Sequence, residues 1–195
     1  MERPTSEQIA ALPLYAALPL ERIHVLRDVA ACELAEQELR LAGHVGFDTE
    51  SKPTFVAGAE QTGPHIVQFA TADRAFIVPT EAPEVATFLR AMLESQEIVK
   101  VGFGLDSDRG HLYRKLGVRL GGSVDVSHMV RRLGFKQAVG LRAAVAVVLG
   151  QRLPKSKKVT TSNWASRNLS PQQLQYAAND AHASLMVYQA LLQRA

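Results

Sequence analysis

The order in which strand-like and helix-like segments follow one another constrains this fold more than any other feature of the sequence. Strands are expected at residues 23–26, 44–50, 65–71, 74–79, 98–103 and 123–126, and helices at residues 28–41, 83–93, 108–116, 141–149 and 171–193. The two residues between the third and fourth strands predict a hairpin. Three strands in close succession, followed by strand–helix–strand units, predict an α/β fold with a mixed sheet flanked by helices.

The length of 195 residues suits a single domain. We interpret residues 1–22 as an irregular arm with one short helical turn, and residues 23–195 as the domain. Two prolines, Pro13 and Pro19, interrupt the apolar run at residues 9–20, so we expect neither a secretory signal nor a membrane span. The single cysteine, Cys32, suits a reducing compartment, and a cytoplasmic location is therefore expected.

Two carboxylates stand close together on the predicted strand at residues 44–50. Asp48 and Glu50 are two residues apart, so both side chains point to the same face of the sheet. Two neighbouring carboxylates repel each other, and a divalent cation between them removes that cost; their hard oxygen ligands suit Mg²⁺ or Mn²⁺. The alternative is that both acids are simply hydrated at the end of a strand.

The last predicted helix carries a tyrosine and an aspartate on one face. Tyr176 and Asp180 are four residues apart, on a stripe that is otherwise largely apolar. A carboxylate in such surroundings needs a metal, an arginine or a backbone donor as its partner. The face with Gln175, Asn179, His182 and Gln189 is expected to be polar, with His182 at the surface.

Asp106 and Asp108 follow the predicted strand at residues 98–103. Either could cap the helix that begins there, and either could belong to an acidic site. The glycines of Gly102-Phe103-Gly104 suggest a dinucleotide-binding loop, but Ser107 stands where the third glycine of that pattern belongs. A nucleotide-binding oxidoreductase is therefore disfavoured.

Three of these segments resemble, in the same order, the motifs of the DEDDy-type 3′-5′ exonucleases, a family that includes ribonuclease D and the exonuclease domain of the Werner helicase. They are residues 46–50 (GFDTE), 101–108 (VGFGLDSD) and 176–181 (YAANDA). In the second segment the family spacing matches Asp108, with Leu112 four residues later, rather than Asp106. Residues 162–176 also resemble the family's approach to the third motif, and the resemblance extends from about residue 23 to residue 192.

The resemblance implies an RNase H-like fold, with three antiparallel strands followed by parallel strands. It implies a metal-dependent 3′-5′ exonuclease that hydrolyses phosphodiester bonds at the 3′ end of DNA or RNA and releases nucleoside 5′-monophosphates. Two divalent ions, Mg²⁺ or Mn²⁺, are implied as cofactors, and Tyr176 is implied to orient the attacking water. The implied metal ligands, which with Tyr176 form the catalytic set, are Asp48, Glu50, Asp108 and Asp180.

The expected partner is the single-stranded 3′ end of a nucleic acid, with no membrane and no organic cofactor. A net charge of +3 permits a polyanionic partner without requiring one. Basic residues precede the last helix, where they can contact phosphates without reading the base sequence, although such a run is also common on a hydrated surface. The expected substrate contacts are Thr49, Lys155, Lys157 and Lys158, and Gln68 is a weaker candidate.

A catalytically inactive relative that only binds nucleic acid remains as the alternative. The presence of all four acids and of the tyrosine disfavours it.

Overall fold

The computed structural model describes residues 2–54, 58, 60–154 and 156–194. The strands are β1 (Ile23–Val25), β2 (His44–Glu50), β3 (Ile66–Ala70), β4 (Ala75–Pro79), β5 (Val99–Gly102) and β6 (Ser123–Asp125). The helices are α1 (Ser6–Ala10), α2 (Val29–Ala42), α3 (Ala86–Glu94), α4 (Leu105–Leu116), α5 (Val126–Arg131), α6 (Leu141–Ala144), α7 (Lys157–Thr160) and α8 (Pro171–Leu192). A π-helical turn (Val145–Leu149) continues α6, and 3₁₀ turns lie at Leu20–Arg22 and Pro83–Val85.

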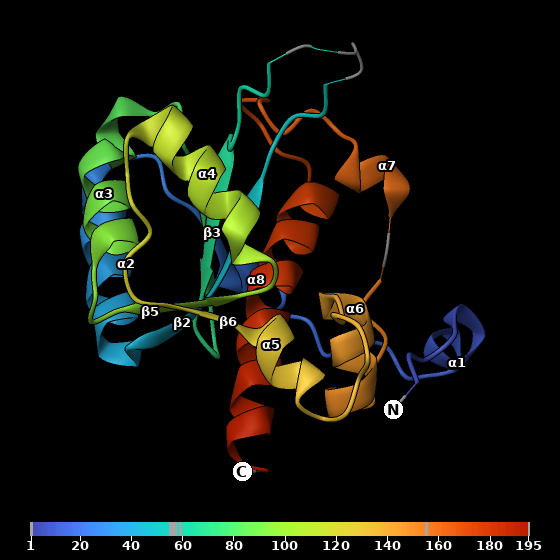
Figure 1. Ribbon diagram of the computed structural model, residues 1–195. Helices are drawn as coiled ribbons and strands as arrows, with labels where there is room; N and C mark the ends of the chain where they lie inside the picture. The colour runs from blue at the N-terminus through green and yellow to red at the C-terminus, as the bar shows by residue number, and fades with distance from the viewer. Residues whose placement is uncertain (1, 55–57, 59, 155, 195) are drawn as a thin grey trace.

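One mixed sheet of six strands organises the molecule, in the order β1-β4-β3-β2-β5-β6 (Figure 1). The strands β2, β3 and β4 are antiparallel, whereas β5 and β6 continue parallel to β2. At the far edge β1 pairs parallel with β4. This arrangement confirms the predicted α/β fold class with its mixed sheet.

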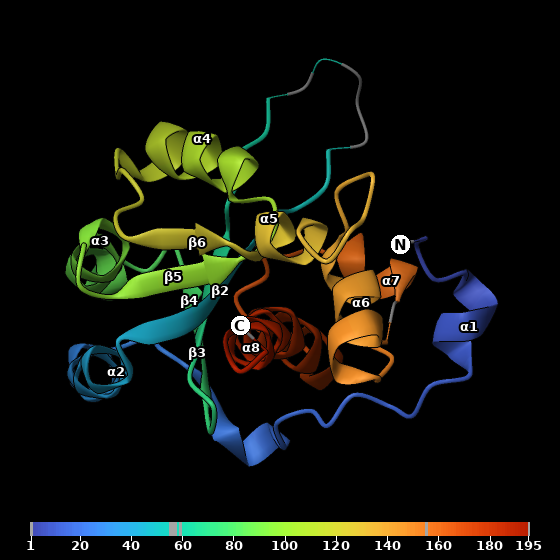
Figure 2. The ribbon, with the colours of Figure 1, turned by 60° about the horizontal axis from the view of Figure 1, so that its bottom comes forward.

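Helices cover both faces of the sheet. The helices α2, α3 and α4 lie on one side, and α8 lies on the other together with α6 (Figure 2). Successive side chains along each strand therefore point alternately to the two helical layers. Phe47 and Phe69 point into the core under α2 and α3, whereas Ile66, Ala70 and Ile77 pack against alanines of α8. Burial on both faces leaves the strand ends as the place for polar chemistry.

The helix α8 is the element that brings the third motif to the sheet. Ser170 caps it as predicted, in a capping box with Gln173, and Pro171 stands in its first turn. Small side chains let the helix approach β2 closely. A Cβ atom on Gly46 would lie only 2.0 Å from the backbone oxygen of Ala181. Glycine at this position therefore sets the distance between the first and third motifs.

The expectation that His182 lies at the surface is wrong. The arm before β1 crosses this face of α8, and the hydroxyl of Tyr15 hydrogen-bonds Nδ1 of His182 at 2.7 Å. Gln175 donates to the backbone oxygen of Leu18, and Asn179 is buried beside it. Gln175 and His182 on the polar face of α8 therefore bind the arm, whereas Gln189 on the same face is exposed.

Among the described residues, no helix combines the length and the hydrophobicity that a membrane crossing requires.

Candidate active site

Three carboxylates from two elements meet at the end of β2. Asp48, Glu50 and Asp180 each place a carboxylate oxygen within 4.8 Å of the others. Asp48 and Glu50 share a face because they are two residues apart on β2, and Asp180 reaches them from the neighbouring α8. The convergence of the first and third motifs that the sequence predicted is therefore present.

Asp108 approaches the same strand end from the other face of the sheet. The residue is 8% exposed, and its carboxylate accepts a hydrogen bond of 2.5 Å from the hydroxyl of Thr49. Asp106, in contrast, has a side chain that is 97% exposed. The geometry favours Asp108 as the acid that belongs to the site, in agreement with the motif spacing.

Neither Asp106 nor Asp108 caps α4. Gly104 takes the N-cap position with a φ of 71°, and the first backbone N–H of the helix, that of Leu105, donates to Asp125 at 3.1 Å. Asp125 comes from the end of β6, so its position could not be read from the local sequence. The helix begins three residues earlier than expected because this cap comes from another strand.

Burial raises the pKa of all four acids, and the charges of neighbouring acids add to the shifts of Asp48 and Glu50. Burial, followed by the charges of Asp180 and Asp108, raises the pKa of Glu50 to about 8. Burial also raises the pKa of Asp180 to about 7, although a hydrogen bond from Tyr176 and the charge of Arg142 oppose this shift. The pKa of Asp48 lies well above its usual range, first through burial and then through the charges of its acidic neighbours.

This donor set fits hard divalent cations. It supplies carboxylate oxygens only, which is the ligand type that Mg²⁺ and Mn²⁺ prefer. Positive charge at this place would offset the burial of the three carboxylates and the repulsion that adds to the pKa shifts of Asp48 and Glu50. The charge of Asp108 raises the pKa of both Asp48 and Glu50, so Asp108 lies close to them. A cation bound beside Asp48 and Glu50 would therefore also be attracted by the Asp108 carboxylate.

Tyr176 lies beside the acids with its hydroxyl held by a neighbouring helix. The hydroxyl of Thr160, the last residue of α7, donates to the Tyr176 oxygen at 3.3 Å. Burial, and then the charge of Asp180, raise the pKa of the tyrosine, so its hydroxyl is protonated at neutral pH.

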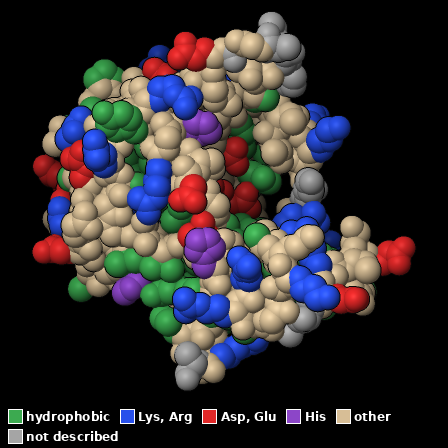
Figure 3. Space-filling view, in the orientation of Figure 1, with side chains coloured by type: hydrophobic (Ala, Val, Ile, Leu, Met, Phe, Trp, Pro, Cys, Tyr) green, Lys and Arg blue, Asp and Glu red, His purple; other side chains and the backbone are tan. Residues whose placement is uncertain are grey.

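The predicted basic loop divides into parts with different surroundings. Lys157 and Lys158 are exposed in the first turn of α7, near Tyr176. Lys155 lies outside the described residues. Arg152 donates instead from Nε to the backbone oxygen of Leu12 and so secures the arm. In the space-filling view, acidic side chains lie at the bottom of a hollow, and basic side chains lie around it (Figure 3).

Comparison with known proteins decides the family. The model of the 3′-5′ exonuclease family matches residues 23–195. The chain belongs to the 3′-5′ exonuclease family. The match includes all three motifs, and it begins at β1 and therefore leaves out the arm.

Relatives of this exonuclease domain include proteins of the Werner type. The chain is 31% identical over 149 residues to the bifunctional 3′-5′ exonuclease/ATP-dependent helicase WRN of Mus musculus, covering 75% of this chain and 11% of the relative. It is 32% identical over 152 residues to a 3′-5′ exonuclease of Arabidopsis thaliana, covering 75% of this chain and 52% of the relative. The chain thus spans about half or less of the length of these relatives.

Solved structures confirm the predicted exonuclease fold. The crystal structure of Trypanosoma brucei RNase D in complex with RNA U12 superimposes with a TM-score of 0.75 at 21% identity, covering 96% of this chain and 65% of that one.

Gln68 lies next to the acids, a position that the sequence indicated only weakly. It pairs directly with Asp48 across β2 and β3, so both side chains lie on the face that α8 covers. The Gln68 side chain is fully buried, and neither its oxygen nor its nitrogen has a hydrogen-bond partner among the described residues. Only the strand register, which pairs it with Asp48, identifies it.

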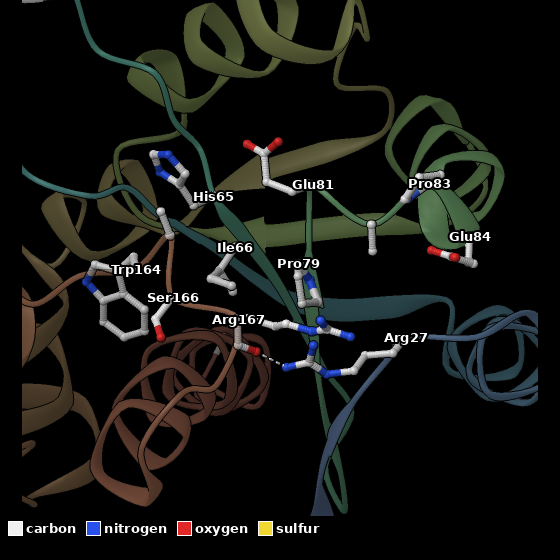
Figure 4. A pocket seen from close by; sticks show the side chains of 12 residues that line it. Arg27, His65, Ile66, Pro79, Glu81, Pro83, Glu84, Trp164, Ser166 and Arg167 are labelled. Atoms are coloured by element: carbon white, nitrogen blue, oxygen red, sulfur yellow. Dashed lines mark hydrogen bonds between the residues drawn. The ribbon is translucent and has the colours of Figure 1, made fainter.

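A cavity of about 430 Å³ lies between the end of β4 and the loop that precedes α8 (Figure 4). Arg27 and Arg167 lie side by side in it, and Arg27 donates to the backbone oxygen of Arg167. None of the four acids lines it. His65 lines the cavity. Its ring Nδ1 accepts a hydrogen bond from the backbone N–H of Lys52, and its backbone N–H donates to the backbone oxygen of Glu50. The cavity therefore adjoins the site through His65, which binds the chain where it leaves β2.

The choice between Asp106 and Asp108 can be tested by paired substitutions. We expect Asp108→Asn to lower exonuclease turnover by at least about a hundredfold, because it removes a charge that acts on Asp48 and Glu50. Asp106→Asn, the same chemical change two residues away at an exposed position, is expected to leave turnover within about twofold. Equal losses in the two variants, measured as initial rates of strand shortening, would show that the assignment is wrong.

Proposed function

We propose that this chain hydrolyses the terminal phosphodiester bond at the 3′ end of a DNA or RNA strand, using two divalent metal ions and releasing nucleoside 5′-monophosphates. One observation carries the proposal: carboxylate oxygens of Asp48, Glu50 and Asp180 lie within 4.8 Å of one another. Membership of the 3′-5′ exonuclease family supports it.

The acids are proposed to hold the ions. Asp48, Glu50 and Asp180 are the nearest ligands, and Asp108 completes the set from α4. When bound, such ions supply Lewis-acid chemistry to the water and to the phosphate oxygens. The hydrogen bond from Thr49 holds the Asp108 carboxylate in place, so we assign Thr49 first to that task; its predicted contact with the substrate remains a proposal.

Tyr176 is proposed to orient the attacking water. Its hydroxyl stays protonated, receives a hydrogen bond from Thr160 and donates one to Asp180, which holds the tyrosine oxygen beside the acids. Lys157 and Lys158 are proposed to bind the phosphates of the strand, because α7 places them on the same helical turn as the residue that holds Tyr176.

The proposal can be tested with strands labelled at the 5′ end. The purified chain is incubated with single-stranded DNA and RNA, with Mg²⁺ or Mn²⁺ and, in parallel, with a chelator. A ladder that shortens from the 3′ end and disappears in chelator supports the proposal. The T. brucei relative is described as a complex with RNA, so the RNA arm is essential. Binding without shortening supports the alternative of an inactive nucleic-acid-binding relative.

Metal binding should stabilise the protein more at alkaline than at acidic pH. Without metal, the raised pKa values of Glu50 and Asp180 mean that the folded state binds more protons than the unfolded state, so stability falls as the pH rises from about 4 to about 8. Divalent ions relieve the repulsion between the deprotonated acids. We expect the rise in Tm on adding Mn²⁺ to be larger at about pH 8 than at about pH 5.5. An equal rise at both pH values contradicts this assignment, and Asp106→Asn serves as the matched control.

A further inference from the structure

A cleft of about 540 Å³ lies between Asp180 and the arm that precedes the domain. Tyr176 and Asp180 line one end of it, and Arg3, Ser6 and Ile9 of the arm line the other. The family match begins at residue 23, so this side of the cleft is built by a segment outside the matched domain. The volume lies in the range of sites that bind small molecules or single groups of a polymer.

The arm is fixed in place by specific contacts. Its backbone pairs with that of Arg152. The backbone N–H of Arg152 donates to the backbone oxygen of Pro13 at 2.8 Å, and the backbone N–H of Tyr15 donates to the backbone oxygen of Arg152 at 3.0 Å. The buried hydrogen bond between Tyr15 and His182 secures the same stretch to α8. Further toward the N-terminus, Arg3 donates to the backbone oxygen of Ala138 at 3.1 Å. The arm is thus held against the domain at both ends of the cleft wall.

Two arginines line this cleft together with Asp180, Arg3 from the arm and Arg142 from α6. Both are exposed. Each uses one N–H group on a backbone oxygen, that of Ala138 and that of Leu153 respectively, and neither forms an ion pair with a carboxylate of a described residue. A guanidinium carries five N–H donors, so most of them remain free for an anion.

We propose that the arm forms one wall of the channel by which the strand reaches the acids, and that Arg3 and Arg142 bind phosphates of the strand near its 3′ end. The inference rests on the proposed exonuclease function and adds to it a binding surface for the substrate. The occupant is a nucleic-acid strand because the cleft is continuous with Tyr176 and Asp180 and because arginine matches the geometry of phosphate. Contacts of this kind bind every base sequence alike.

The test separates binding from turnover. Arg3→Ala and Arg142→Ala are each compared with Arg90→Ala, a control on α3, which covers the other face of the sheet. Affinity is measured by fluorescence anisotropy with labelled poly(dT) and poly(U) strands in an Asp48→Asn background. We expect each cleft variant to weaken binding about three- to tenfold and to lower the slope of log K against log salt by about 0.7. In the otherwise unaltered enzyme, Arg3→Ala should raise KM rather than lower kcat.

The outcomes distinguish this inference from the function on which it rests. If the parent chain does not shorten the strands, the proposed function fails. If the parent shortens them and both cleft variants retain its affinity and salt slope, the channel assignment is overturned. Arg3→Lys keeps the charge and is expected to recover part of the affinity, whereas a defect caused by misfolding would also lower the Tm.

Discussion

Replacing Asp48 by Asn is expected to lower the rate of 3′-end cleavage by about a thousandfold or more, while making the metal-free protein more stable. Cleavage falls because a ligand of the proposed metal ions is lost, and those ions are worth several kcal/mol in the transition state. Stability rises because burial and the neighbouring acids disfavour the ionised Asp48 carboxylate in the folded protein, and asparagine carries no charge. The two effects therefore have opposite signs.

The measurement compares initial rates of strand shortening with Tm values in chelator. Asp106→Asn is the control, since it changes the same group on a side chain that is 97% exposed. A variant at Asp48 that cuts as fast as the parent would falsify the site. One that loses both activity and metal-free stability would mean that Asp48 supports the fold rather than the chemistry.

The strands and long helices could be predicted because their signals are local. The alternation along β2, the hairpin between β3 and β4, and the Ser170-Pro171 start of α8 all depend on neighbouring residues. The short helices α5 and α7 were missed for the opposite reason. With six and four residues, they contain too few turns to show a periodic pattern, and tertiary contacts stabilise them.

The candidate site could be predicted only in part, because it depends on contacts between distant segments. The resemblance to the family motifs predicted Asp48, Glu50, Asp108 and Asp180 as the acids of the site, and the structure brings three of them, Asp48, Glu50 and Asp180, within 4.8 Å. Three other features have no local signal: the cap that Asp125 gives to α4, the burial of His182 and the place of Gln68 opposite Asp48. Each results from a partner supplied by another strand or by the arm.

The second large effect is expected from the substitution Gly46→Ala, at the place where β2 approaches α8 most tightly. An added Cβ atom would meet the backbone oxygen of Ala181 at 2.0 Å and its carbonyl carbon at 2.7 Å. Backbone atoms of a long helix cannot turn aside as a flexible side chain can, so β2 and α8 must separate. We expect a loss of about 1–3 kcal/mol in the free energy of unfolding, or more where the two elements cannot adjust.

Activity should suffer more than stability. Gly46 lies two residues before Asp48, and Ala181 directly follows Asp180, so the clash separates the two acids that are proposed to share an ion. A displacement of about 1 Å in a catalytic group can cost about a hundredfold in rate. We therefore expect at least that loss at a temperature where the variant is still folded, as checked by circular dichroism and by strand shortening in the same samples.

Two further variants decide whether backbone contact is the cause. Gly110→Ala places the same methyl group on α4 with no atom within 4 Å, and it is expected to raise stability by about 0.5–1 kcal/mol, as alanine does in helices. Adding Ala181→Gly to Gly46→Ala is expected to restore neither property, because the clash is with the carbonyl group and not with the methyl group. Recovery in that double variant would place the contact in the side chains, and glycine at position 46 would then not set the spacing of the acids.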